Sequence, residues 1–420
     1  MLLSMNTTDD LLIESFAAQP ASLRIAIVTE TFPPEVNGVA MTLGRIVTGM
    51  VRRGHAVQLI RPRQKLENTM PKFNGIEEII SPGVPVPTYG ELRFGLPSKR
   101  RLIKLWRTRR PDIVHVVTEG PLGWSAVAAA RKLQLPLTSS FHTNFQSYTQ
   151  HYGLSLFKAP IESYLRKLHN RTQVTMVPTR ALMDDLQHRG YDNVKLLSRG
   201  VAAELFSPRK RSQALRISWG VTDDDLVVLL VGRLAKEKNV GLVISAFRAI
   251  QQIKPSARLV FVGDGPMRQT LQFSCPQAVF AGVQKGEDLA AHYASADLFL
   301  FSSLTETYGN VVPEALASGL AVVSYACAAA QELITSGVNG ILVPVNDEAD
   351  FIANAVDIAN NVGALATMRL AAAPSVAHLN WDTIFVSFEG HLRRAVESTC
   401  AGFHLGIPTS PAPVMSRASA

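Results

Sequence analysis

Short runs of apolar, β-branched residues alternate with longer helical patterns along most of this chain, and the alternation starts twice. The first series of runs is LRIAIVTE (23–30), AVQLIRP (56–62), DIVHVV (112–117) and PLTSSFH (136–142). The second is DLVVLLVGR (225–233), ARLVFVGDG (257–265), AVFAGV (278–283), ADLFLFSS (296–303), LAVVSYA (320–326) and GILVPVN (340–346). Strands that alternate with helices form parallel sheets covered on both faces. The sequence therefore predicts an α/β protein with two doubly wound, Rossmann-like domains facing each other across a cleft, where ligands lie beyond the carboxyl ends of the strands.

The domain boundaries follow from where this alternation stops. Residues 201–222 lack a buried strand and carry a proline and a basic cluster, so we expect them to link the domains. The two ends of the chain show no periodicity and are expected to be disordered tails. The expected division is a tail at 1–22, a first domain at 23–200, the linker, a second domain at 223–380, a final helix at 381–398 and a tail at 401–420.

Composition excludes several classes of protein. With 47% apolar and 18% charged residues, disorder and coiled coil are both poor fits, and no apolar stretch reaches the ~20 residues that span a bilayer. Three scattered cysteines give neither a disulfide framework nor a CxxC metal site, so we expect a reduced, cytoplasmic protein. Basic residues outnumber acidic ones only in the first half, which favours phosphorylated ligands, an anionic membrane surface or nucleic acid as partners.

The most informative segment is SSLTETYGNVVPEALASG (302–319), where a buried strand gives way to a polar loop and then a helix. The N–H groups near Gly309 and Asn310 would point out of the helix N-terminus, where phosphate can bind. Glu306 in the loop and Glu314 in the first helical turn can accept hydrogen bonds from sugar or ribose hydroxyls. From these two residues alone, the favoured interpretation is that Glu314 complements the helix dipole and that Glu306 is a solvated loop residue.

A second basic loop, VGRLAKEKN (231–239), follows another strand. Arg233 can fork onto phosphate oxygens and Lys238 adds a point charge, so together they can neutralise a diphosphate without metal. The alternative is a solvated basic loop, and Glu237 is expected to face solvent.

Two positions in the first domain are candidates for the same cleft. Gly38 follows Asn37 where a helix begins, and a glycine lets the backbone approach a phosphate closely. His142 ends a strand at the carboxyl edge of the sheet, although most histidines in a protein are structural.

The segment from Arg93 to Arg110 holds eight basic residues and no acidic one. On a helix, Leu102, Ile103 and Trp106 would share the side that packs on the sheet. The opposite side is either a solvated face or a contact with anionic lipid, worth ~1 kcal/mol per charge near the surface. We do not expect nucleic acid, because aromatic residues do not interleave with the charges. The residues expected on this side are Arg100, Arg101, Lys104 and Arg107.

Other chemistry has little support. Asp223 to Asp225 contain a DxD pattern, but they stand before a strand rather than after one, which indicates a solvated turn. VGDGP lacks the full G-x-G-x-x-G of dinucleotide oxidoreductases, and no H-E-x-x-H, G-x-S-x-G or Walker sequence is present. We therefore expect no metal site and no cofactor.

The E-x7-E spacing of Glu306 and Glu314, followed by EALASGLAVV, resembles the retaining glycosyltransferases of family 4, which have the GT-B fold. The resemblance covers nearly all of 23–398, with VGRLAKEKN, VGDGPMR, ASADLFLFSS and GVNGILVP in family order and spacing. In the first domain, ETFPPEVNGVAMTL, PTYGELRFGLP, PDIVHVVTEGPLG and SSFHTNF are similar to bacterial GDP-mannose-dependent α-mannosyltransferases.

This resemblance implies retaining transfer of a hexose, mannose from GDP-mannose, to a lipid or glycan acceptor. Together with the cysteine usage and the basic segment, it leads us to expect a cytoplasmic protein, peripheral at the inner face of the cell membrane. It assigns the pyrophosphate clamp to Arg233 and Lys238, the donor sugar to Glu306 and His142, and the ribose to Glu314. It also implies that the final helix packs back on the first domain. The remaining expected donor contacts are Gly38, Gly232, Val283, Tyr308, Gly309 and Asn310.

The chain departs from the family at three places. Asn37 stands where two adjacent glycines are common, Ala202 stands where many relatives carry Asp, and Ala328–Ala330 replace a common Gly-Gly pair. Three alternatives stay open. They are a transferase of glucosyl, N-acetylglucosaminyl or sulfoquinovosyl groups from a UDP-sugar, a phosphorylase of the same fold, and a non-catalytic module that binds nucleotides or membranes.

Overall fold

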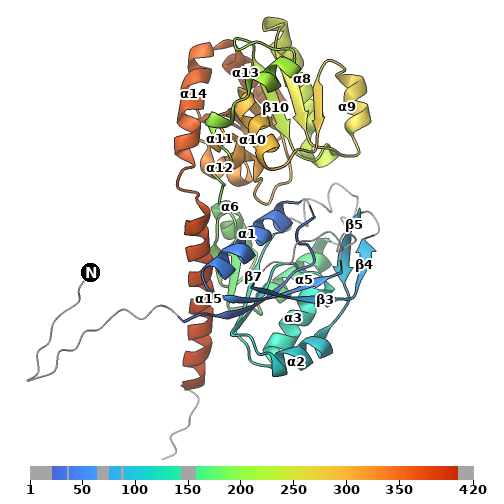
Figure 1. The fold of residues 1–420 in the computed structure, drawn as a ribbon, viewed down its shortest axis with the longest axis vertical. Helices are drawn as coiled ribbons and strands as arrows, with labels where there is room; N and C mark the ends of the chain where they lie inside the picture. The colour runs from blue at the N-terminus through green and yellow to red at the C-terminus, as the bar shows by residue number, and fades with distance from the viewer. Residues whose placement is uncertain (1–20, 36, 64–74, 87–88, 143–157, 405–420) are drawn as a thin grey trace, which may run out of the picture.

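The computed structural model describes residues 21–404 except 36, 64–74, 87–88 and 143–157, and its strands and helices form two halves (Figure 1). Most of the two expected tails, residues 1–20 and 405–420, lies outside the described residues. Residues 401–404 are not tail, because the final helix continues through them.

The first half is built on a parallel sheet in the order β3-β2-β1-β6-β7-β8-β9. Alternate residues of the central strand β1 enter different cores, with Ile25 and Ile27 on one face and Ala26 and Val28 on the other. A sheet buried on both faces needs such continuous apolar strands. The strands are β1 Arg24–Val28, β2 Ala56–Pro62, β3 Ile76–Ser81, β6 Ile113–Val116, β7 Leu137–Ser140, β8 Val174–Val177 and β9 Val194–Leu196.

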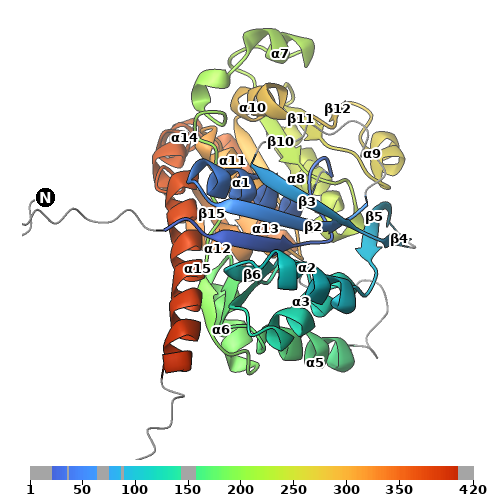
Figure 2. The ribbon, with the colours of Figure 1, turned by 60° about the horizontal axis from the view of Figure 1, so that its bottom comes forward.

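Helices cover both faces of this sheet, and an antiparallel hairpin of β4 and β5 lies beside it (Figure 2). Helix α1 packs on the face that holds Ile25, whereas α2 and α3 pack on the face that holds Ala26. The elements are β4 Gly83–Val86, β5 Tyr89–Gly95, α1 Gly38–Arg52, α2 Lys99–Thr108, α3 Pro121–Lys132, α5 Lys158–His169 and α6 Arg180–His188.

The second half repeats this plan with a parallel sheet in the order β12-β11-β10-β13-β14-β15. Its strands are β10 Val227–Val231, β11 Arg258–Val262, β12 Val279–Gly282, β13 Leu298–Phe301, β14 Ala321–Tyr325 and β15 Gly340–Val343. Its helices are η4 Lys236–Lys238, α8 Val240–Ile253, α9 Arg268–Ser274, α10 Gly286–Ser295, α11 Val311–Ala317, α12 Ala328–Leu333, α13 Glu348–Asn360 and α14 Val362–Ser375. The predicted pair of doubly wound sheets is therefore confirmed.

Residues 201–222 pack into the second half rather than crossing freely between the halves. They form η3 Pro208–Lys210 and α7 Gln213–Ser218, and Phe206 and Trp219 lie in the core of the second half. Arg216 is fully buried, and its guanidinium donates to Asp297 at 3.1 Å. The sequence did not predict this packing, because short helices with scattered apolar residues give no continuous apolar run in the sequence.

The final helix, α15 Trp381–His404, returns to the first half and lies along it in both views (Figures 1 and 2). Phe385, Phe388 and Leu392 share a core with α1. A side chain at Gly49 of α1 would overlap the Phe385 ring, so this glycine permits the close approach of the two helices.

Candidate functional site

Loops from the carboxyl ends of both sheets meet where the two halves join. Gly38 begins α1 after β1, and a Cβ atom there would lie 3.5 Å from both Arg199 Nη1 and Asn310 Nδ2. Asn310 precedes α11 in the second half, so residues predicted to approach one diphosphate from opposite sides lie together.

Asn37, a departure from the family pattern, caps α1. Its Oδ1 accepts hydrogen bonds from the N–H groups of Val39 at 3.1 Å and Ala40 at 2.8 Å. These are the groups with which a helix N-terminus binds an anion. The asparagine therefore replaces part of what this helix end could otherwise offer to a phosphate.

Lys238 and Glu306 form an ion pair between the loops after β10 and β13. Ser303 Oγ donates to the same Glu306 carboxylate at 2.9 Å. Ser302 Oγ donates to the carbonyl oxygens of Lys238 at 3.0 Å and Asn239 at 2.9 Å, which holds the two loops together. Lys238 and Glu306 were both predicted as site residues from the sequence, but their ion pair was not.

Arg233 lies in the same loop as Lys238, after β10. Its side chain is 45% exposed, and its Nη1 is 4.0 Å from Glu237 Oε1. The expectation that Glu237 faces solvent is wrong, because only 9% of the residue is exposed. It lies in the short helix η4, whose turn directs the side chain inward. Gly232 has a φ of 147°, in the region that favours glycine, at the end of β10.

Helix α11 begins as predicted after Asn310, and Gly309 before it has a φ of 84°. Glu314 lies in its first turn, and Tyr293 Oη donates to Glu314 Oε2 at 3.0 Å. Burial raises the pKa of Glu314 to about 7, although the Tyr293 hydroxyl and the charge of Arg45 act in the opposite direction. The Glu314 carboxylate therefore has a hydrogen-bond partner, Tyr293, besides its position near the positive end of the helix dipole.

His142 follows the end of β7 and contacts Arg199, whose Nη2 donates to His142 Nδ1 at 3.3 Å. Thr143 and Asn144, the next residues of its motif, lie outside the described residues. Burial, and then the nearby Arg199 charge, hold the pKa of His142 well below its usual value. The imidazole is therefore neutral at physiological pH.

Arg199 also belongs to this cluster, and the sequence analysis did not predict it. Its Nη1 donates to Asn310 Oδ1 at 3.1 Å, and its guanidinium lies 5.4 Å from the centre of the Tyr308 ring. Tyr308 Oη in turn donates to the Arg199 carbonyl at 3.3 Å. A basic residue after β9 would have been the only sequence signal.

The remaining predicted positions lie further from this cluster. Val283 follows the edge strand β12, two strands from β10, and is 54% exposed. On α2, Leu102 and Trp106 are buried, while Arg100, Arg101, Lys104 and Arg107 are all exposed, as predicted. Among the described residues, no helix is both long and apolar enough to cross a bilayer.

The predicted turn at Asp223 to Asp225 is confirmed at the amino end of β10. Asp225 accepts hydrogen bonds from the Thr222 N–H at 2.7 Å and Oγ at 2.8 Å, and Asp223 is 71% exposed on its side chain. Within the described part of the chain, no three His, Cys, Asp or Glu residues gather as metal ligands.

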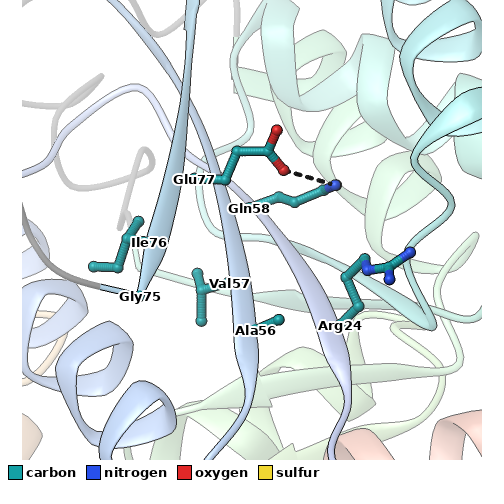
Figure 3. Close-up of a pocket in the computed structure, with 7 residues that line it drawn as sticks. All are labelled: Arg24, Ala56, Val57, Gln58, Gly75, Ile76 and Glu77. Atoms are coloured by element: carbon teal, nitrogen blue, oxygen red, sulfur yellow. Dashed lines mark hydrogen bonds between the residues drawn. The ribbon is translucent and has the colours of Figure 1, made fainter.

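A pocket of the first half lies away from the predicted site (Figure 3). Arg24, Ala56 and Ile76, which begin β1, β2 and β3, line it with Val57, Gln58, Gly75 and Glu77. Ligands of doubly wound sheets bind at the carboxyl ends of the strands, so this amino-end pocket is not part of the candidate site.

Comparisons with known proteins match both halves. The model described as Glycosyltransferase Family 4 matches residues 36–205, and the one described as Glycosyl transferases group 1 matches residues 225–361. A GDP-mannose-dependent alpha-mannosyltransferase of Mycobacterium tuberculosis is 34% identical over 378 residues, which cover 88% of this chain and 96% of that protein. Sulfoquinovosyl transferase SQD2 of Arabidopsis thaliana is 32% identical over 359 residues, which cover 82% and 69%.

Among solved structures, Anabaena Alr3699/HepE in complex with UDP superposes with a TM-score of 0.73 at 19% identity. The superposition covers 89% of this chain and 100% of that one. This likeness confirms the predicted GT-B fold, with two Rossmann-like domains.

Proposed function

Because this chain belongs to glycosyltransferase family 4, we propose that it transfers mannose from GDP-mannose, with retention of the α configuration, to a hydroxyl group of a lipid or glycan. That it is a hexosyltransferase follows from the family. The observation that carries the finer assignment is the 34% identity, over 88% of the chain, to a protein named for GDP-mannose. We place the reaction in glycolipid or polysaccharide synthesis.

The departing diphosphate is the charge that grows in the transition state. Arg233, Lys238 and the N–H groups at the start of α11 stabilise it, and fixed charges in a partly buried site do this without reorganising. When the donor binds, its diphosphate replaces Glu306 as the ionic partner of Lys238. The released Glu306 carboxylate then accepts hydrogen bonds from the hydroxyls of the donor sugar.

His142 and Glu314 hold the two ends of the donor. The neutral imidazole of His142 hydrogen-bonds the reacting hexose without adding a charge that would compete with the diphosphate. Glu314, oriented by Tyr293, accepts from the ribose hydroxyls. The acceptor hydroxyl attacks the face that the leaving group departs from, and an oxygen of the donor phosphate takes its proton. No metal or other cofactor takes part in this scheme.

The exposed basic face of α2 supports a contact with anionic lipid, which would bring a lipid acceptor to the protein at the inner face of the cell membrane. The charges point away from the core, and Leu102 and Trp106 fix the orientation of the helix. We therefore propose a cytoplasmic protein that binds the membrane peripherally.

A UDP-sugar-dependent transferase is the second candidate, because the sulfoquinovosyl transferase relative is nearly as similar. A donor panel separates the two. Release of nucleoside diphosphate is measured with GDP-mannose, UDP-glucose, UDP-N-acetylglucosamine and UDP-sulfoquinovose, with and without excess chelator, and the Arg233→Ala variant serves as the blank. We expect release of nucleoside diphosphate from GDP-mannose. Turnover of the UDP-sugars alone would favour the second candidate.

The chelator tests whether a metal is needed. Loss of activity in chelator, restored by Mn²⁺ or Mg²⁺, would refute metal independence and make Asp223 and Asp225 candidate metal ligands again.

A further inference from the structure

Arg199 lies between the two halves, and only 6% of it is exposed. Its guanidinium donates to His142 of the first half and to Asn310 of the second, and it lies over the Tyr308 ring. Gly38 lies next to it, since a Cβ atom there would be 3.5 Å from Arg199 Nη1. Arg199 is therefore enclosed by four residues that the sequence analysis had assigned to the donor.

The charge of Arg199 has no close counter-ion among the described residues. No carboxylate in that part of the chain pairs with it, and its Nε is buried without a hydrogen-bond partner. Glu306 acts on Arg199 electrostatically but forms its ion pair with Lys238. Burial lowers the pKa of Arg199 to about 10, which leaves it charged at neutral pH. A buried cation without an anionic partner is costly, so a site built in this way favours an anion.

We infer that Arg199 is a third cation of the donor site and that its counter-ion is the diphosphate of the nucleotide sugar. The inference rests on the proposed function and extends the clamp of Arg233 and Lys238 by a residue from the other half. The planar guanidinium matches phosphate oxygens in a fork, and its unpartnered Nε–H is one of the donors that such a fork uses. Since Arg199 also holds Asn310, diphosphate binding there ties the first half to the second.

Calorimetric titration with inorganic pyrophosphate, GDP and UDP tests the inference. Arg199→Met removes the charge at similar length, and we expect all three ligands to bind roughly 10- to 100-fold more weakly, the size of a charged hydrogen bond. Guanosine and uridine, which lack phosphate, should bind the variant as they bind the wild type. Wild-type affinity of the folded variant for pyrophosphate would overturn the inference and make Arg199 a structural link.

Two further variants keep the test decisive. Arg211→Met removes another partly buried arginine, which pairs with Asp297 away from the site, and should lower stability without changing pyrophosphate affinity. If Arg199→Met does not fold, Arg199→Gln removes the charge but keeps a hydrogen-bond donor, so we expect weaker pyrophosphate binding. Unchanged affinity of the folded Gln variant would also overturn the inference.

The outcomes also separate this inference from the proposed function. A protein that prefers UDP-sugars but loses UDP affinity in the Arg199 variant keeps the inference and loses the mannosyl assignment. If the enzyme uses GDP-mannose and the Arg199 variant binds nucleotide normally, the mannosyl assignment stands and the inference about Arg199 is lost.

Discussion

The ammonium group of Lys238 is paired with the carboxylate of Glu306, so two residues assigned to different parts of one donor hold each other. Ser303 supports the pair by donating to the same carboxylate. In the proposed function, a diphosphate that binds Lys238 releases Glu306 toward the sugar, so mutation should separate the roles of the two residues.

Replacing Glu306 with Ala should lower kcat while nucleoside diphosphate still binds. The variant loses the carboxylate that holds the donor sugar, which should reduce kcat by roughly 10- to 100-fold, but it also frees Lys238 for phosphate. Turnover and calorimetric titration with GDP measure the two effects. Ser303→Ala is the matched control, because it removes a supporting hydrogen bond and leaves the charge. Equal losses of binding and turnover in the Glu306 variant would show that the residue also holds the nucleotide.

Replacing Glu314 with Ala should mainly weaken nucleotide affinity, by roughly the 1.5–3 kcal/mol of a charged hydrogen bond. The effect should be seen in GDP titrations, whereas kcat at saturating donor stays near the wild-type value. Tyr293→Phe removes only the hydroxyl that orients the carboxylate, so its loss of affinity should be smaller. A Glu314 variant with normal affinity and low kcat would exchange the roles given to the two glutamates.

Glu314 should also make stability depend on pH. Its pKa is raised to about 7 in the folded protein, so the folded state favours the protonated form and stability falls as pH rises from about 4.5 through 7. Glu314→Gln removes this titration, and its stability relative to the wild type should increase between pH 5 and pH 8. Urea unfolding at both pH values measures the difference, and Glu30, whose pKa is also raised to about 7, contributes equally to both proteins. A difference that does not change with pH would contradict the assigned pKa.

The exposed charges of α2 should bind vesicles rich in anionic lipid. Changing Arg100, Arg101, Lys104 and Arg107 together to Gln should leave the fold intact and weaken vesicle binding in co-sedimentation, and the wild-type binding should fall with salt. A matched control changes four exposed basic residues elsewhere, Lys132, Lys195, Arg209 and Lys285. If the wild type ignores these vesicles at low salt, α2 is a solvated face and the acceptor is soluble.

The central strands of both sheets could be predicted from the sequence, because strands buried on both faces consist of continuous apolar runs. Shorter or more polar strands were not predicted. Strand β9 has three residues, and β3 at the sheet edge carries Glu77 and Glu78 within IEEIIS. Such strands depend on their neighbours rather than on their own pattern.

The residues of the candidate site also fall into two groups, those that the sequence predicted and those that it did not. Residues fixed by local motifs, such as Gly309 before α11 or Lys238 after β10, were found where predicted. Arg199 and Tyr293 contact candidate residues that are distant in sequence, and spacing along the chain does not reveal such contacts. Among the departures from the family, Ala328 has a φ of 49°, a conformation that suits the glycine common at that place.

Calorimetric titration of the protein with GDP and with UDP, under the same conditions, decides which nucleotide the donor carries. We expect GDP to bind at least about tenfold more tightly than UDP, a difference of about 1.4 kcal/mol. Equal or tighter binding of UDP would contradict the assignment to GDP-mannose.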